Sequence, residues 1–391
     1  MAITRTSLPI LTPCLTTKAT ARGLLLTTLA LLALGVVMVN STIASVAEPP
    51  RWYARMDVRH GIFAALALLV LAVGCKLDYR RLGPGRNFPV LAALVLAAAV
   101  TCAALVFVPG IGRAVGGYYR WVRLGPPKYQ IGFQPSEVIK VSLVIFLAAY
   151  LSREALDVRS FTRAFLPAVL VTGGCVALII TQDFGTGMII VVSAAVTMLL
   201  AGVPWYYLMT LAAPAAAGCY FFIVRSGFRL ARIQAMFDPW SRTNPSAYQP
   251  RQSLIAIISG GWFGKGPGKG ILKFGFLPED STDFIFAAFC EEWGFMGAML
   301  LMGLVAMWIW FARRSAVHAG DKFGGTLAGS LGLLIALQAV MHIAVNMGKM
   351  PATGISLPFV SAGGTSLVIL AGATALIVSV AARGKPDRLS V

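Results

Sequence analysis

Long apolar runs separated by short polar segments make up most of this chain. About 20 apolar residues in helical form cross the hydrocarbon core of a bilayer, and the runs approach that length. The pattern predicts about ten spanning helices, at 23–46, 60–75, 88–108, 136–151, 164–181, 186–202, 204–224, 284–311, 325–345 and 365–383. The first run is too long for the apolar part of a cleaved signal peptide, so it counts as a span. We therefore expect an all-α polytopic membrane protein.

The composition supports this prediction. Of the 391 residues, 58% are hydrophobic and 12% are charged, whereas soluble domains carry roughly 25% charged residues. The net charge of +18 comes with basic residues that lie between the spans, which favours anionic lipid headgroups or phosphates as partners over nucleic acid. The six cysteines have neither metal-binding nor disulfide spacing, so we interpret them as small apolar helix residues.

Lysine and arginine residues mark alternate short connections, and basic short loops remain on the cytoplasmic side of a membrane. These inner positions are Lys76, Arg80, Arg81, Arg86, Arg153, Arg159, Arg163, Arg313, Arg314, Lys322, Arg383, Lys385 and Arg388. The predicted topology therefore has both termini inside and an even number of spans. It divides the chain into a cytoplasmic segment 1–22, a single transmembrane domain 23–383 and a cytoplasmic tail 384–391.

Larger outer loops follow at about 109–135, 225–283 and 346–364, and the second of these lies between helices 7 and 8. This loop is rich in basic residues, although long loops are exempt from the charge rule. An anionic ligand at the outer face would account for the excess charge, and contact with anionic lipid of the outer leaflet is the alternative. Its glycine-rich part, 260–275, has no GxxxxGK[ST] pattern and no preceding strand, so it is not a P-loop.

The first outer loop ends in charged residues at the start of a span. Arg120 and Trp121 come first, and Gln134 with the proline after it marks a helix start. Glu137 and Lys140 then lie three residues apart on one helical face. Such a pair at membrane depth either shapes a polar binding site or forms a purely structural ion pair.

Two further groups of charged residues follow along the chain. Asp183 interrupts a long apolar stretch, and it either faces protein or water at a site or caps the next helix. Arg225, Arg229 and Arg232 are spaced to share one helical face, which suits a phosphate or diphosphate. The alternative is the solvated side of an interfacial helix.

Asp283 follows Ser281 and Thr282 just ahead of a new apolar run. Either hydroxyl would cap a helix that begins near Asp283, and the free N–H groups of its first turn favour an ionised carboxylate. An ionised carboxylate is what a general base needs. The alternative is a helix-capping acid with no chemistry. Glu279 and Asp280 are close enough in sequence to be confused with Asp283 in this role.

Other polar residues of the outer loops complete the candidate substrate-binding set. They are Gln249, Gln252, Lys265, Lys273, Ser361 and Thr365. The hydroxyls of the last two would bind a sugar or a phosphate, unless they only satisfy the backbone of a re-entrant turn. One of Glu291 and Glu292, two to three turns beyond Asp283, is expected to face the bundle interior.

Five segments, in this order, resemble the SEDS (shape, elongation, division and sporulation) family of bacterial cell-wall polymerases, and more its division branch, FtsW, than its elongation branch, RodA. They read RWVRLG…FQPSEVIK, QDFGT, FDPW…YQPRQSLIAIISGGWFGKG, LPEDSTDFIFA…EEWGFMG and LPFVSAGGTS. The resemblance covers about 120–382. It implies a multi-pass peptidoglycan glycosyltransferase of the bacterial cytoplasmic (inner) membrane with its active site on the outer face.

The resemblance also implies a substrate and a mechanism. The family polymerises lipid II, the undecaprenyl-diphosphate-linked disaccharide-peptide, and its essential aspartate lies in an HTDF motif that matches Ser281-Thr282-Asp283-Phe284. Asp283 would take the proton from the acceptor GlcNAc 4-hydroxyl, whose oxygen attacks the donor anomeric carbon with inversion and releases undecaprenyl diphosphate. Arginine and lysine side chains, or a divalent cation (Mg²⁺ or Mn²⁺), would stabilise the departing charge.

A class B penicillin-binding transpeptidase and other membrane proteins of the division or elongation machinery are the expected partners. A lipid II flippase and a noncatalytic division scaffold stay open as alternatives, although a flippase would need charged residues through both leaflets. The chain departs from the family at Ser281, in place of its usual histidine, and at His342, which aligns with its usual asparagine. Neither departure affects Asp283, but both leave the substrate contacts undecided.

Overall fold

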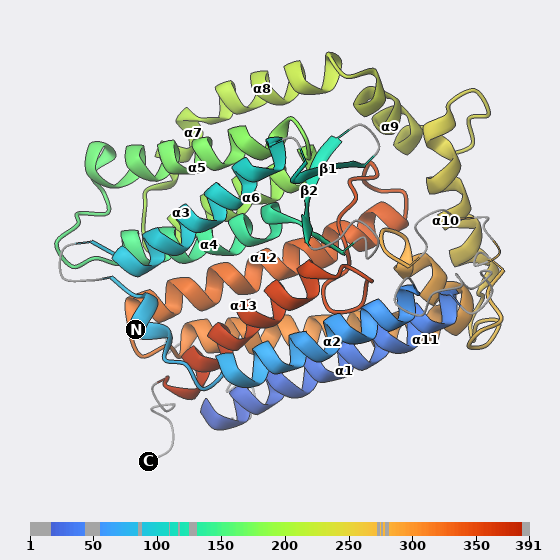
Figure 1. Ribbon diagram of the computed structural model, residues 1–391, viewed down its shortest axis with the longest axis horizontal. Helices are drawn as coiled ribbons and strands as arrows, with labels where there is room; N and C mark the ends of the chain where they lie inside the picture. The colour runs from blue at the N-terminus through green and yellow to red at the C-terminus, as the bar shows by residue number, and fades with distance from the viewer. Residues whose placement is uncertain are drawn as a thin grey trace, which may run out of the picture.

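The computed structural model describes residues 17–43, 55–84, 88–108, 110–115, 118–124, 131–271, 274, 277 and 281–384. The fold is mainly helical (Figure 1). Its α-helices are α1 Thr17–Ile43, α2 Met56–Gly74, α3 Val90–Ala104, α4 Pro135–Leu151, α5 Leu166–Ile180, α6 Phe184–Ala201, α7 Trp205–Thr210, α8 Ala212–Val224, α9 Gly227–Phe237, α10 Tyr248–Ser259, α11 Ile285–Val317, α12 Lys322–Asn346 and α13 Thr365–Ala382. The prediction of an all-α polytopic membrane protein is confirmed in class.

Nine helical segments of the described ranges are long and apolar enough to cross a membrane. The remaining predicted span corresponds to α4, which has 17 residues and carries a Glu–Lys pair in its first turns. All of its residues except Val138 are buried. Since protein rather than lipid surrounds α4, it needs less apolar length and tolerates charge; the count of ten and the topology stay predictions.

The most deeply buried helices lie in the middle of the bundle. In Figure 1, α4, α12 and α13 run through its centre, with α1, α2 and α11 below them and α3, α5, α7 and α8 above. The α13 and α12 windows are 72% and 61% buried, whereas none of the Trp205–Val224 window is. Helices α7 and α8 therefore form an outer layer with mostly exposed apolar side chains, of which only a few, such as Tyr207 and Leu208, pack against the protein.

A small antiparallel sheet was not foreseen from the sequence. Strands β1 Gly112–Val115, β2 Tyr118–Leu124 and β3 Ile131–Phe133 pair in the order β1-β2-β3. Aromatic and β-branched residues in β2 favour an extended strand, but the run is too short and too mixed to be distinguished from a loop. The sheet carries Arg120 and Trp121 of the first outer motif.

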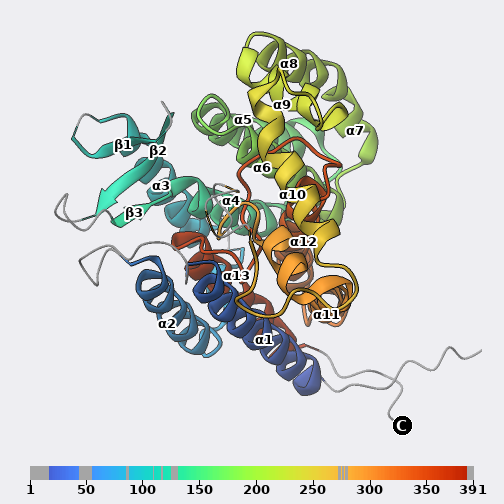
Figure 2. The same cartoon turned by 90° about the vertical axis from the view of Figure 1, so that its right-hand side faces the viewer.

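The polar motifs gather at one end of the bundle. The sheet, α9 and α10 lie toward the end opposite to that at which α1 begins and α13 ends (Figure 1). Seen from that end, the sheet stands on one side and α9 with α10 on the other (Figure 2). Segments that are more than 100 residues apart in the chain therefore come together around one region.

The glycine-rich loop after α10 forms backbone hydrogen bonds with α11 where that helix is interrupted. Gly294 has φ 65° and ψ −165°, which interrupts the helix. The backbone amides of the two residues after it donate to carbonyl oxygens of Gly261 and its neighbour, and the carbonyl oxygens of Glu291 and Glu292 accept from amides of the loop. The loop thus satisfies four of the backbone groups next to the break, as buried backbone requires.

Two buried glutamates hold this loop to the bundle. The Lys265 Nζ lies 2.6 Å from Glu291 Oε1. Both carboxylate oxygens of Glu292 accept from the Ser41 hydroxyl of α1, at 2.6 and 2.7 Å, and Oε2 also accepts from the amide of Gly268 at 3.1 Å. Both glutamates, rather than one, face the interior.

The close approach of loop and helix predicts an effect of Gly264→Ala. Gly264 has φ +77°, and a Cβ there would collide with the carbonyl oxygen of Glu292, whereas Gly261 has φ +55° and open space around it. Both alanine variants lose about 1–2 kcal/mol to the left-handed conformation. Only Gly264→Ala should add about 1–3 kcal/mol of overpacking. Limited proteolysis should therefore cleave the loop faster in Gly264→Ala than in Gly261→Ala. Equal rates in the two variants would contradict the close packing of this loop against α11.

Candidate active site

The segment before α11 differs from the prediction. The helix begins at Ile285, and Phe284 is in the N-cap position without a side-chain cap hydrogen bond, so Asp283 precedes the first turn. The predicted serine or threonine cap is therefore wrong. Asn346, at the end of α12, takes its place, since its Oδ1 accepts from the amide of Ala287 at 3.0 Å.

Contacts from α12 and from the last outer loop fix the backbone around Asp283. The Asn346 Nδ2 donates to the backbone carbonyl oxygen of Asp283 at 3.0 Å. The Ser361 hydroxyl donates to the backbone carbonyl oxygen of Thr282 at 2.8 Å. The Asp283 carboxylate is half-buried. It lies beside Gly354, where an added Cβ would be 3.6 Å from its Oδ2. The carboxylate is therefore held against the 351–354 segment.

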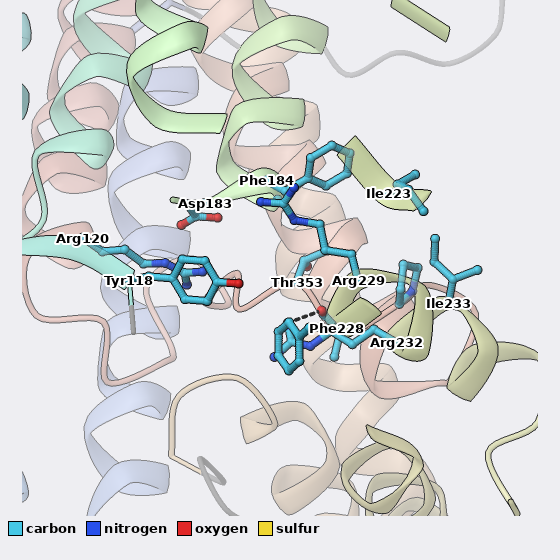
Figure 3. A pocket seen from close by; sticks show the side chains of 13 residues that line it. Tyr118, Arg120, Asp183, Phe184, Ile223, Phe228, Arg229, Arg232, Ile233 and Thr353 are labelled. Carbon is cyan, nitrogen blue, oxygen red and sulfur yellow. Dashed lines mark hydrogen bonds between the residues drawn. The ribbon is translucent and has the colours of Figure 1, made fainter. Parts of the chain in front are cut away.

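That segment forms one wall of a polar pocket, which we call the arginine pocket (Figure 3). Four parts of the chain contribute to it: the sheet, the start of α6, the α8–α9 region and the 351–353 segment. The lining residues are Tyr118, Arg120, Asp183, Phe184, Gly185, Ile223, Phe228, Arg229, Arg232, Ile233, Pro351, Ala352 and Thr353.

Three guanidinium groups face this pocket, and their hydrogen bonds go to backbone carbonyl oxygens. Arg120 Nε donates to Gln182 at 2.7 Å, Arg232 Nη1 donates to Ala352 at 2.6 Å, and Arg229 donates to Phe222 and to the last carbonyls of α5. In the described ranges none of the three forms an ion pair. Their positive charge is therefore positioned without being neutralised by a carboxylate in contact.

The predicted stripe of three arginines on one helix is wrong in part. Arg225 follows α8 as its C-cap residue, and its guanidinium packs over the Phe221 ring. A new helix begins after Ser226, whose side chain accepts from the amide of Arg229. Because the chain turns there, Arg225 is separated from Arg229, and β2 supplies the third guanidinium of the pocket instead.

Electrostatic coupling joins Arg232 to Asp283. Burial lowers the pKa of the Arg232 guanidinium from its ordinary value, and the negative charge of Asp283 opposes this effect. An arginine side chain keeps its proton in proteins, so this group is a cation at neutral pH. Asp283 is not itself a lining residue of the arginine pocket, and its charge acts on Arg232 from its place beside Gly354.

Asp183 both caps a helix and lines the pocket. Its Oδ1 accepts from the amide of Thr186 at 3.0 Å, and its Oδ2 accepts from the hydroxyl of the same residue at 2.9 Å. The two readings of this residue, helix cap and site residue, are compatible in the structure. Next to Gly185, the Thr353 hydroxyl is buried and has no hydrogen-bond partner in the described ranges. It is available to a ligand oxygen.

The Glu137–Lys140 pair lies behind the site as a buried ion pair. Lys140 Nζ is 2.7 Å from Glu137 Oε1, and both side chains are almost fully buried. The Ser366 hydroxyl donates to Glu137 Oε2 at 2.8 Å, and the Thr365 hydroxyl accepts from the amide of Gln134. These contacts join the starts of α4 and α13, which supports the site-shaping and the structural interpretation equally.

The other predicted site residues are dispersed. Trp121 lines a second pocket, described below, and Lys265 is paired with Glu291. The Ser361 hydroxyl is used by the backbone of Leu357 and Thr282. Gln249 and Gln252 are half-buried on α10 and line neither pocket. Lys273 and Glu279 lie outside the described residues.

The side chains in the described ranges do not form a resident metal site. No three His, Cys, Asp or Glu side chains come together there. Two carboxylates, Asp183 and Asp283, adjoin the arginine pocket, where three guanidiniums already supply positive charge. This donor set does not fit a protein-held divalent cation, so no step below is derived through one.

Comparison with known proteins identifies the family. The family described as Cell cycle protein, which comprises FtsW, RodA and SpoVE, matches residues 22–385. The chain belongs to this family. The FtsW/RodA/SpoVE match confirms the resemblance inferred from the five sequence segments, and it extends through the first spans.

Relatives within the FtsW/RodA/SpoVE family are similar over nearly the whole chain. A probable peptidoglycan glycosyltransferase FtsW from Thioalkalivibrio sulfidiphilus is 35% identical over 366 residues, which cover 92% of this chain and 88% of that protein. Stage V sporulation protein E of Bacillus subtilis is 33% identical over 373 residues, covering 94% and 98%.

Solved structures show the same fold. A chain from a peptidoglycan synthase complex that coordinates polymerization and crosslinking has a TM-score of 0.74, with 25% identity over 92% of this chain and 97% of that one. The rod shape determining protein RodA of Thermus thermophilus has a TM-score of 0.65, with 26% identity over 92% and 95%. A multi-pass membrane protein of the FtsW/RodA/SpoVE type is thus established.

Proposed function

We infer that this chain is a peptidoglycan glycosyltransferase that polymerises glycan strands in cell division. Family membership and the FtsW relatives support the enzyme class. The site adds the chemistry: a half-buried carboxylate stands beside a pocket with three guanidiniums. The enzyme acts on lipid II, in which a diphosphate joins the disaccharide-peptide to a polyprenyl chain.

In the proposed reaction Asp283 is the general base. It removes the proton of the acceptor GlcNAc 4-hydroxyl, and the oxygen attacks the anomeric carbon of the donor sugar. The bond from that carbon to the diphosphate oxygen breaks, and the configuration inverts. The diphosphate carries away the electron pair, and Arg120, Arg229 and Arg232 stabilise its developing charge.

One observation carries this proposal: three guanidiniums converge on a pocket while bonding only backbone carbonyls among the described residues. Half-buried guanidiniums with no carboxylate in contact are typical of a site that receives an anion such as a diphosphate. The terminal carbonyls of α5 also favour a cation at the position of Arg229. The pocket is thus preorganised for a diphosphate.

The predicted topology and the similarity to known proteins also support a location and a partner. The polar end of the bundle faces outward from the bacterial cytoplasmic membrane, because the predicted basic inner loops lie at the other end. A penicillin-binding transpeptidase is the partner that would crosslink the new strand, in keeping with the similarity to a chain of a peptidoglycan synthase complex.

Polymerisation of purified lipid II tests the function and the pocket together. Arg229→Ala and Arg232→Ala should each lower the polymerisation rate by about 100-fold, the usual cost of removing one donor to a developing anion. Arg242→Ala, at an exposed arginine of the same outer segment, should keep the wild-type rate. The readout is glycan chain length on gels, with the transpeptidase partner present.

Polymerisation, lipid transport and support of cell division, measured together, separate the alternative functions. A wild-type protein that makes no glycan polymer with its partner, but carries labelled lipid II across a liposome membrane, would be a flippase. A protein that does neither and still supports division would be a scaffold. Equal rates for Arg229→Ala, Arg232→Ala and Arg242→Ala would overturn the role of the arginine pocket.

A further inference from the structure

A second pocket lies on the other side of the Asp283 segment. It has a volume of about 400 Å³ and is enclosed by α2, the sheet, Thr282 and the 362–364 turn. We call it the His60 pocket. Its polar and aromatic lining residues are Arg59, His60, Arg113, Trp121 and Thr282.

The two pockets share two walls. On β2, Arg120 lines the arginine pocket and Trp121 lines the His60 pocket, because neighbouring residues of a strand point to opposite faces. Before α11, Thr282 lines the His60 pocket, and Asp283 lies against Gly354, next to the 351–353 segment that lines the arginine pocket. The proposed catalytic base therefore stands between the two pockets.

His60 is the residue that most clearly lacks a partner. It is 4% exposed, and neither of its ring nitrogens has a hydrogen-bond partner in the described part of the chain. Buried polar groups are nearly always bonded, and an unbonded one costs free energy. An imidazole has at least one N–H donor. Because His60 lines this pocket, its ring can donate a hydrogen bond to a ligand oxygen.

The charge of the His60 pocket selects the kind of ligand. Arg59 of α2 and Arg113 of β1 line it, and no acidic side chain is among its described lining residues. Arg113 forms no ion pair in the described ranges. Trp121 packs flat against Gly132, where an added Cβ would be 2.9 Å from the indole ring. Guanidiniums, an imidazole and an indole together fit an oxyanion attached to a sugar.

Glycan polymerisation needs two lipid-linked sugars at once, one on each side of the base. We propose that the His60 pocket binds the anionic part of a second lipid-linked disaccharide-peptide, which reacts with the molecule in the arginine pocket. This assignment rests on the proposed polymerase function. The shared chemistry is an oxyanion, supplied either by the diphosphate or by the carboxylates of the peptide.

Native mass spectrometry of the full chain tests the proposal by counting bound molecules. With Asp283→Asn, which stops turnover, lipid II should bind in two copies per protein. Adding Arg113→Ala or His60→Leu should weaken the second copy by about 10-fold, the loss of one hydrogen bond to a charged group. His60→Gln, which keeps a donor, should retain it. Arg123→Ala is the matched control, because Arg123 is an exposed arginine of the same sheet.

Undecaprenyl diphosphate, which lacks the peptide, identifies the source of the oxyanion. Two copies that depend on Arg113 would assign the pocket to the diphosphate, and one copy would assign it to the peptide carboxylates. The proposal is overturned if Arg113→Ala and His60→Leu bind the second lipid II as Arg123→Ala does, or if only one copy binds. Failure of the polymerase function is recognised separately, by a wild-type protein that binds lipid II but makes no glycan.

Discussion

Replacing Asp283 by asparagine is expected to lower the rate of glycan polymerisation by about 1000-fold, in the middle of the range that general base catalysis contributes. Asparagine keeps the shape of the side chain but does not accept the proton of the acceptor hydroxyl. The backbone contacts from Asn346 and Ser361 do not involve the carboxylate, so the local fold should persist. The measurement is the initial rate of lipid II consumption by the purified protein with its partner.

Binding distinguishes a chemical defect from a structural one. Asp283→Asn should bind lipid II about as well as the wild type, so that the loss appears in kcat rather than in KM. Asp157→Asn makes the same substitution at an exposed site in the connection after α4 and should keep full activity. An Asp283→Asn protein with more than a tenth of the wild-type rate would remove this residue as the base.

The second large effect concerns stability. Lys140→Met should destabilise the protein by about 3–5 kcal/mol, because it leaves the Glu137 carboxylate buried without its cation. The pair is 2.7 Å apart, and only the Ser366 hydroxyl would remain as a donor among the described residues. Thermal unfolding of the purified protein in detergent measures the loss.

A double variant serves as the control for this effect. Glu137→Gln with Lys140→Met removes both charges and keeps similar volumes, so much of the lost stability should return. A double variant that is less stable than Lys140→Met alone would show that these two side chains stabilise the protein through contacts other than their ion pair. A Lys140→Met protein that unfolds at the wild-type temperature would contradict the buried ion pair.

The membrane helices could be predicted from the sequence because hydrophobic length is a local property. Most predicted spans agree with helices of the structure within a few residues, including the ones that end at Ile180 and Val224. The exceptions have local causes. The helix boundary at Ser226 separates Arg225 from Arg229, and β2 forms in a segment whose apolar pattern is too short to read.

The site could be predicted only where a residue type is unusual for its surroundings. Asp283, Asp183 and the arginines are conspicuous in an apolar chain, and the structure brings several of them to one pocket. Asn346 was missed, although a buried amide at the end of a spanning helix is itself a signal. His60 and Thr353 could not be found, because their importance lies in the absence of partners among the described residues.

The glycine-rich loop shows why a motif needs its context. The excess of basic residues in the outer loop favours an anionic ligand, and Lys265 is therefore in the candidate substrate-binding set. In the structure Lys265 neutralises Glu291, and loop amides bond to the broken α11. The partner of the loop lies more than 20 residues further along the chain, so its role depends on a tertiary contact.

A structure of the Asp283→Asn protein with bound lipid II tests the central claim most directly. The account predicts a diphosphate within hydrogen-bonding distance of Arg229 and Arg232, and an acceptor 4-hydroxyl within 3.2 Å or so of the residue 283 side chain. A diphosphate bound away from both arginines, with no sugar hydroxyl near residue 283, would contradict it.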